Sequence, residues 1–128
     1  MGEILFRAES GNEWVYGDLI HLFGKNNVAI HHAEHEGETR NYIDIIPETV
    51  GQYTGTPDKN RNKIFECDIV KAFKNNEEPF VAVVTKRNGC FWFGNWNWCE
   101  FLDKFRNYEV IGNVFDNPEL VKGGEQGG

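Results

Sequence analysis

The chain has 128 residues, of which 40% are hydrophobic and 14% aromatic, enough for the core of one domain or of two small lobes. Its formal net charge of −7 disfavours binding to the phosphate backbone of DNA or RNA. The longest apolar run, residues 80–84, is too short to span a bilayer, and the three cysteines include no C-x-x-C pair. These totals predict a folded cytoplasmic protein with reduced thiols and with neither a signal peptide nor a membrane segment.

Short β-type runs dominate the first half of the chain. The sequence predicts four strands there: residues 4–7, 14–23, 28–30 and 42–46. The first two flank the turn-forming triplet Ser10-Gly11-Asn12, so we expect an opening hairpin. The polar segment 34–41 separates the last two. Segment 47–60 holds two Gly and two Pro, and we interpret it as a structured connector between two halves.

The second half is also predicted to be β-rich. We expect strands over residues 63–66, 68–73, 80–87, 90–93 and 108–115. The pair Asn88-Gly89 lies between two of these strands and is the strongest hairpin signal in the chain, because both residue types tolerate positive φ. The Gly-rich tail, residues 121–128, is expected to be flexible.

The stretch CFWFGNWNWCEF, residues 90–101, is the most unusual in the chain, because it holds two Cys, three Trp and three Phe. It could form a stacking platform for a ligand, or it could fill the core of a small protein. A hairpin strand followed by a helix accounts for its aromatics without a ligand, which favours the core. Trp92 is the exception, because it alternates with Phe91 and Phe93 and should face outward or into a groove if they face inward.

One helix is predicted near residues 98–106. Its apolar stripe consists of Trp98, Phe101, Leu102 and Phe105, at the i, i+3, i+4 and i+7 positions of one helix face. Asn97 is a good N-cap and Glu100 completes a capping-box-like pair. We expect Trp96 to pack against Phe101 as a hydrophobic staple.

Motifs for catalysis are missing from the sequence. Ser10 is the only serine and lies in a predicted turn, and neither a P-loop nor a G-x-G-x-x-G motif is present. The three cysteines lie in apolar surroundings, where a thiol is less reactive. We therefore expect a protein that is not an enzyme and that uses no cofactor.

Four histidines form the one cluster with metal-ligating potential: His21, His31, His32 and His35. The last three lie within five positions and alternate with glutamates. Structural zinc usually takes ligands from two separated segments, so His21 would have to lie beside this loop. A solvated loop is the simpler interpretation, and the sequence predicts no metal site.

Several blocks of sequence go beyond these general patterns. They are FRA, EWVYGDLI (13–20), ETVGQYTG (48–55), DKNRNKIFECDIV (58–70) and EVIGNVFDNPEL (109–120). In this order, they resemble the YopX family, which bacteriophages, prophages and other mobile elements of bacteria encode. The resemblance implies a mostly-β fold in two parts, residues 1–56 and 57–120, the second similar to a small SH3-like barrel with one helix. It also implies a bacterial cytoplasmic location. The family has no agreed catalytic residues, so none is carried over.

Two positions depart from the family pattern. The family commonly has Asn-Gly where this chain has Asn60-Arg61, and Arg at positive φ costs on the order of 1 kcal/mol. We therefore expect the turn to have changed type, with Asn60 or Asn62 in the left-handed conformation. The family also favours Gly where Cys67 stands, at a point where the backbone needs a bulge or a close approach. Gly112 matches the family and is interpreted as a backbone requirement.

The leading expectation for function is a non-catalytic binding module that holds a host or phage macromolecule and forms a homo-oligomer. The expected exposed aromatic contacts are Trp14, Tyr16, Tyr53 and Trp92. The alternative is an oligomer that sequesters nucleotide signals through aromatic stacking and the basic tip Lys59, Arg61 and Lys63. The simpler interpretation of this tip is a solvated hairpin end. Acidic mimicry of DNA is disfavoured, because the carboxylates are scattered along the chain.

Overall fold

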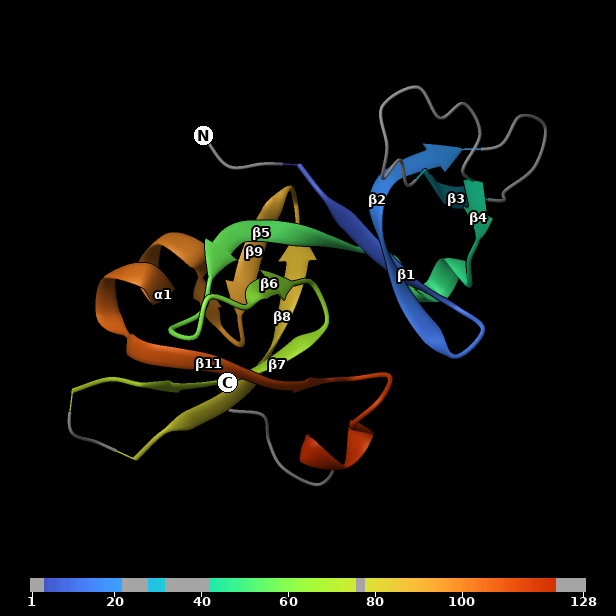
Figure 1. Ribbon diagram of the computed structural model, residues 1–128. Helices are drawn as coiled ribbons and strands as arrows, with labels where there is room; N and C mark the ends of the chain where they lie inside the picture. The colour runs from blue at the N-terminus through green and yellow to red at the C-terminus, as the bar shows by residue number, and fades with distance from the viewer. Residues whose placement is uncertain (1–3, 22–27, 32–41, 76–77, 122–128) are drawn as a thin grey trace. The chain divides into compact units, whose positions relative to one another are not determined.

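The computed structural model describes residues 4–21, 28–31, 42–75 and 78–121 (Figure 1). The chain divides into two compact units, residues 1–53 and 54–128, each of which is described by itself. The architecture is mainly β, and the described residues contain one α-helix, as the sequence predicts. The predicted polar segment 34–41 and the tail after Val121 lie outside the described residues.

The first unit is an antiparallel sheet. Its strands are β1 (Phe6–Ser10), β2 (Glu13–His21), β3 (Val28–His31), β4 (Tyr42–Asp44) and the start of β5 (Gly51–Pro57), in the order β4-β3-β2-β1-β5. β1 and β2 form the predicted opening hairpin, in which Ser10 pairs with Glu13. Gly11 in its turn has a φ of 67°, a conformation that favours glycine.

The segment 47–60, predicted as a structured connector, contains regular secondary structure over most of its length. It begins with a 3₁₀ turn, η1 (Pro47–Thr49), and continues as the seven-residue strand β5. Thr49 fixes this start, because its buried Oγ1 accepts from Glu9 N (2.8 Å) and donates to Ile46 O (2.7 Å). The chain therefore passes from one unit to the other as regular strand.

The second unit is built on a five-stranded antiparallel sheet with the order β10-β9-β8-β7-β11. Its elements are β6 (Lys63–Phe65), which neighbours β5, β7 (Asp68–Phe73), β8 (Phe80–Arg87), β9 (Cys90–Phe93), β10 (Trp96–Asn97), α1 (Trp98–Lys104), β11 (Arg106–Asn113) and the 3₁₀ turn η2 (Pro118–Leu120). The Asn88-Gly89 hairpin is confirmed: Arg87 pairs with Cys90, and the φ angles of the two turn residues are 52° and 81°. Positive φ at both positions is what a type I′ turn requires.

The aromatic stretch fills the core of the second unit. The buried cluster consists of Ile64, Val70, Ala72, Ala82, Val84, Phe93, Phe101 and Phe105, with Trp96 and Trp98 half-buried against it. The Phe93 and Phe101 rings have centroids 4.6 Å apart. The core interpretation is therefore confirmed. Trp96, however, packs on Phe105 (5.1 Å between centroids), one helical turn beyond the staple that we expected.

Helix α1 starts where the sequence predicts, because Asn97 Oδ1 accepts a hydrogen bond from Glu100 N (2.9 Å). α1 contacts β9 and β10 (Figure 1). It has seven residues and ends at Lys104, where the sequence predicted a helix to about residue 106.

The two sheets do not close into a barrel, so the SH3-like barrel that the resemblance implied is matched only loosely. The turn after β5 lies instead against β11. Lys59 N donates to Tyr108 O (3.1 Å), and Val110 N donates to Asp58 Oδ2 (2.9 Å). These bonds satisfy backbone groups of β11 without another strand.

The turns at Arg61 and Cys67 keep left-handed backbone conformations. Arg61 has a φ of 72°, so the prediction that the turn changes type and passes this conformation to Asn60 or Asn62 was wrong. Cys67 has a φ of 73° in the tight turn between β6 and β7, which agrees with a position suited to glycine. Gly112 is a steric requirement, because a Cβ atom there would lie 2.5 Å from Asn117 Oδ1.

Candidate functional site

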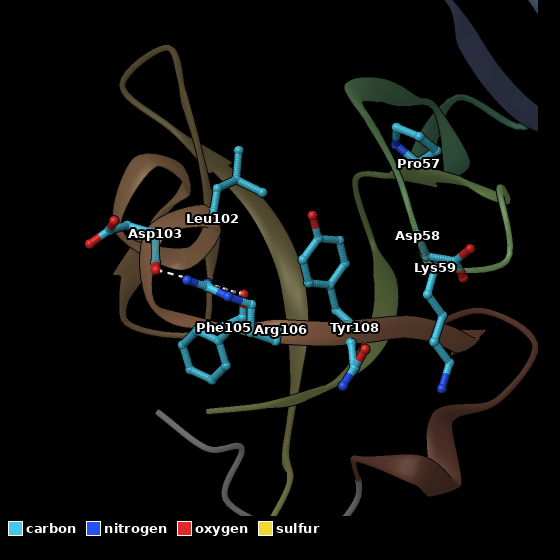
Figure 2. Close-up of a pocket in the computed structure, with 9 residues that line it drawn as sticks. Pro57, Asp58, Lys59, Leu102, Asp103, Phe105, Arg106 and Tyr108 are labelled. Atoms are coloured by element: carbon cyan, nitrogen blue, oxygen red, sulfur yellow. Dashed lines mark hydrogen bonds between the residues drawn. The ribbon is translucent and has the colours of Figure 1, made fainter. Parts of the chain in front are cut away.

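An open pocket of about 420 Å³ lies in the second unit, where α1 leads into β11 (Figure 2). The lining residues are Pro57, Asp58, Lys59, Leu102, Asp103, Phe105, Arg106, Asn107 and Tyr108. They come from two short segments that are more than forty positions apart in the sequence. The volume lies in the range typical of small-ligand sites, roughly 300–1,000 Å³.

Apolar groups provide one part of the pocket lining. Figure 2 shows the Tyr108 ring between Leu102 of α1 and Pro57 of β5, and Tyr108 packs on the buried Phe101 ring with centroids 4.9 Å apart. Leu102 is 39% exposed, so its predicted place in the buried stripe was wrong. Since neighbouring helix residues are about 100° apart around the axis, the residue after Phe101 turns away from the core. Leu102 therefore presents an apolar side chain to the pocket.

Arg106 is held at the rim of the pocket. Its Nη1 donates to the carbonyl oxygens of Asp103 and Phe105, both at 2.9 Å (Figure 2). These oxygens lie at the C-terminal end of α1, where carbonyl groups lack helical partners and a cation is favourable. These contacts fix the guanidinium beside the pocket.

Asp58 organises the opposite wall. Its carboxylate is 5% exposed and accepts hydrogen bonds from the backbone N–H groups of Asn60 (2.8 Å), Asn62 (2.8 Å) and Val110 (2.9 Å). Three donors on one buried carboxylate fix the turn that carries Lys59. Asp58 is a functional position that our sequence analysis missed, although an Asp followed by Asn at the second and fourth positions is compatible with such a turn.

Two hydrogen bonds join β5 and the turn after it to α1 and β11, the elements that carry the pocket. Trp98 Nε1 at the start of α1 donates to Thr56 Oγ1 in β5 (3.1 Å), in addition to the bond between Lys59 N and Tyr108 O. The walls are therefore fixed before any ligand arrives. Such preorganisation reduces the entropy that binding has to overcome.

The basic tip predicted from the sequence lies partly at this pocket. Lys59 lines it, and its Nζ lies 3.1 Å from Glu109 Oε1 in a partly exposed ion pair. Arg61 and Lys63 are exposed. Arg61 lies in the turn after β5, and Lys63 is the first residue of β6. Exposed pairs such as Lys59 and Glu109 contribute little stability and can exchange for a ligand contact.

Three of the expected aromatic contacts belong to the first unit. Trp14 is half-buried under the Arg7 guanidinium, 4.6 Å from its ring centroid, and Tyr16 is 43% exposed. Tyr53 is only 7% exposed, so the expectation of an exposed ring was wrong. In β5, Gly51 and Tyr53 are buried while Gln52 between them is less so, which places the Tyr53 ring on an inward position of the strand.

Trp92 in β9 does not line the pocket. It is half-buried, the Arg87 guanidinium lies 4.2 Å from its ring centroid, and its buried Nε1 has no hydrogen-bond acceptor among the described residues. Phe93 faces the core on the neighbouring position, as the predicted alternation requires. Of the residues proposed for ligand contact, the pocket therefore contains Lys59 alone.

The histidine cluster falls largely outside the described residues. His21 is the last residue of β2 and His31 the last residue of β3, but their side chains are not described, and His32 and His35 lie outside the described residues. Among the described residues, no three His, Cys, Asp or Glu side chains form a group that could hold a metal ion. The histidine hypothesis stays a prediction.

A family model described as YopX protein matches residues 5–122. The chain belongs to the YopX family. Its fold is also similar to the crystal structure of a protein from Enterococcus faecalis, with a TM-score of 0.62 and 23% sequence identity over 95% of this chain and 100% of that one. At this identity the likeness shows the fold alone. No curated protein matches the YopX chain. No helix in the described part of the chain is long and apolar enough to cross a membrane.

Proposed function

We propose that this YopX chain is a non-catalytic binding protein, and that the pocket at the α1–β11 corner holds part of its partner, a host or phage macromolecule. The observation that carries the proposal is an open, preorganised pocket with an exposed leucine, Leu102, beside a tyrosine ring, Tyr108. Apolar and aromatic groups in a concave site are the usual anchors of a bound partner.

The polar groups of the pocket support binding over catalysis. Asp58 accepts three backbone hydrogen bonds and Arg106 donates to two carbonyl oxygens. General acid–base work needs a side chain that can reach a reacting group and exchange a proton with it. Here these side chains hold the walls in place, and their bonds would have to break before they could act on a substrate.

The proposal includes the setting in which the protein acts. We propose a homo-oligomer in the cytoplasm of a bacterial host, with no membrane contact and no non-specific binding to nucleic acid. The cysteines Cys67, Cys90 and Cys99 form no disulfide with one another, which fits a reducing compartment. Light scattering after size exclusion tests the oligomer, and a monomer at high concentration would remove that part of the proposal.

Two equally exposed leucines allow a matched test of the pocket. Leu102 and Leu120 are both 39% exposed, and only Leu102 lines the pocket. A photo-reactive residue at position 102 should capture a discrete partner from a bacterial extract, while the same residue at position 120 should not. Excess wild-type chain should compete for this partner, and excess Leu102→Glu chain should not. Equal labelling from both positions, or equal competition by both chains, would refute the pocket as the binding site.

The alternative function is sequestration of a nucleotide signal by an oligomer. It is favoured by one observation: Lys59 of the basic tip lines the same pocket as the Tyr108 ring. A thermal-shift screen with a panel of nucleotides separates the two functions. A rise of several degrees in Tm supports sequestration, and a flat panel leaves the macromolecular partner.

A further inference from the structure

Arg61 is a non-glycine residue in a backbone conformation that disfavours side chains. Its φ is 72°, at the exposed end of the turn between β5 and β6. Among the described residues with positive φ, most are Gly or Asn, which tolerate this region, whereas Arg has no such preference. A strained residue away from the core points to a use for its side chain.

The strain is imposed by the turn and is not offset by the Arg61 side chain. Arg61 N donates to Asp58 O (2.9 Å), and the Asp58 carboxylate holds Asn60 and Asn62 on either side. Within the residues that the structure describes, the Arg61 guanidinium makes no hydrogen bond or ion pair. The turn therefore presents this cation to solvent, two residues after Lys59 in the pocket wall.

The two chain segments that contain the pocket residues carry a positive charge, while the lining residues themselves are balanced, with Lys59 and Arg106 against Asp58 and Asp103. Residues 57–63 and 102–109 carry five cations against three carboxylates, a local charge of +2 in a chain whose total is −7. The cations are Lys59, Arg61, Lys63, Lys104 and Arg106. One of the carboxylates, Asp58, is already bound by three backbone N–H groups. A multiply charged anion is the ligand group that such a cluster favours.

We propose that Arg61 is a specificity-determining residue that binds a phosphate-type anion of a small ligand, whose planar ring lies against Tyr108 and Leu102 in the pocket. Lys59 and Lys63 add positive charge to the same turn. A guanidinium matches phosphate oxygens in a two-bond geometry that an ammonium cannot reproduce. Nucleotides have this combination of ring and anion. The inference rests on the pocket of the proposed function and develops its alternative, in which the ligand is a nucleotide.

The variant Arg61→Gly tests whether the Arg61 side chain binds a ligand or whether the turn only tolerates an arginine at this position. Arg61→Gly removes the cation and also relieves the left-handed backbone, so its Tm should equal or exceed that of the wild type. Arg61→Lys keeps a charge and the strain. Sodium pyrophosphate and a panel of nucleoside di- and triphosphates serve as probes of the full chain, with NMR shifts of the Lys59, Leu102 and Tyr108 amides and calorimetry as readouts.

We expect pyrophosphate and the nucleotides to shift the pocket amides, and Arg61→Gly to weaken binding about tenfold or more, the typical loss of a charge-assisted hydrogen bond. Arg61→Lys should lose less, and the wild-type affinity should fall as NaCl rises. Wild-type affinity in Arg61→Gly would overturn the role of Arg61. Nucleotides should bind more tightly than pyrophosphate, and Leu102→Glu should remove this difference in affinity. Equal affinities of the wild type for nucleotides and pyrophosphate would show that the ring does not bind in the pocket.

Failure of this inference can be distinguished from failure of the proposed function. If no phosphate probe shifts the pocket amides but a residue at position 102 still captures a partner, the ligand class is wrong and the binding site stands. If the probes bind through Arg61, the inference holds whatever the capture experiment gives. If neither occurs, both the inference and the pocket are refuted.

Discussion

Two adjacent residues of α1 have different surroundings, because Phe101 lies in the core and Leu102 lines the pocket. Phe101 is fully buried between Phe93 and Phe105, and Leu102 is 39% exposed at the pocket. Both came from one predicted apolar stripe. The comparison teaches that a single short helix can supply core on one side and a pocket lining on the other, so that neighbouring substitutions can change the stability and the pocket separately.

The largest effect is expected for Phe101→Ala. Removing a buried aromatic ring from this cluster should lower the free energy of unfolding by about 3–5 kcal/mol. Leu102→Ala is the control and should cost less than about 1 kcal/mol, because its side chain is already partly in water. Urea unfolding followed by tryptophan fluorescence measures both. Similar losses in the two variants would break the division between core and pocket.

Asp58→Ala tests the wall opposite Leu102. It leaves the N–H groups of Asn60, Asn62 and Val110 without their acceptor, so we expect a loss of about 2–3 kcal/mol. Hydrogen exchange should accelerate most at these three amides, which lose their local acceptor, and less in β8, which follows only the global loss of stability. The exposed carboxylate of Asp103 is the control, and Asp103→Asn should stay within about 0.5 kcal/mol of the wild type. Equal effects would mean that Asp58 does not hold the turn.

Asn97→Ala should destabilise α1 as a whole, and with it both the buried and the exposed side of the helix. Loss of the N-cap, whose Oδ1 accepts from Glu100 N, should cost about 1 kcal/mol. Asn95→Ala, at an exposed turn position just before β10, is the matched control and should be close to neutral. Thermal unfolding by circular dichroism is sufficient to compare them. A neutral Asn97→Ala would show that packing alone fixes the start of the helix.

The smallest effect on stability is expected for Leu102→Glu, although its effect on binding should be large. Its free energy of unfolding should lie within about 0.5 kcal/mol of the wild type, since the side chain is exposed. Capture of the partner should be lost. Leu120→Glu should leave both quantities unchanged. If Leu102→Glu unfolds the chain, the residue belongs to the core after all, and the comparison of the two faces fails.

Elements with strong local signals were predicted well from the sequence. β7, β8 and β9 and the Asn88-Gly89 turn were found where they were expected, because alternation and turn chemistry act within a few residues. β5 was missed, because Gly51, Gly55 and two prolines resemble a loop although every second residue at its start is buried. Leu102 was misplaced, because helical spacing alone does not show where an apolar stripe ends.

The pocket could not be predicted from the sequence. Its two segments are brought together by long-range bonds, those of Trp98 to Thr56 and of Val110 to Asp58, and no local pattern records such a pairing. The left-handed Arg61 was missed for the opposite reason. Propensity disfavours the conformation, but the Asp58 carboxylate fixes the turn around it and overrides the preference of one residue.

The carboxylate of Asp58 also determines the way in which anything can approach β11. A strand whose outer N–H and C=O groups are unoccupied can recruit an extended segment from another molecule as an additional strand. Here the Asp58 carboxylate accepts a hydrogen bond from the amide of Val110, and the amide of Lys59 donates one to the carbonyl oxygen of Tyr108. The middle of this edge of β11 is therefore not available for such strand addition, which favours a partner that binds through side-chain contacts.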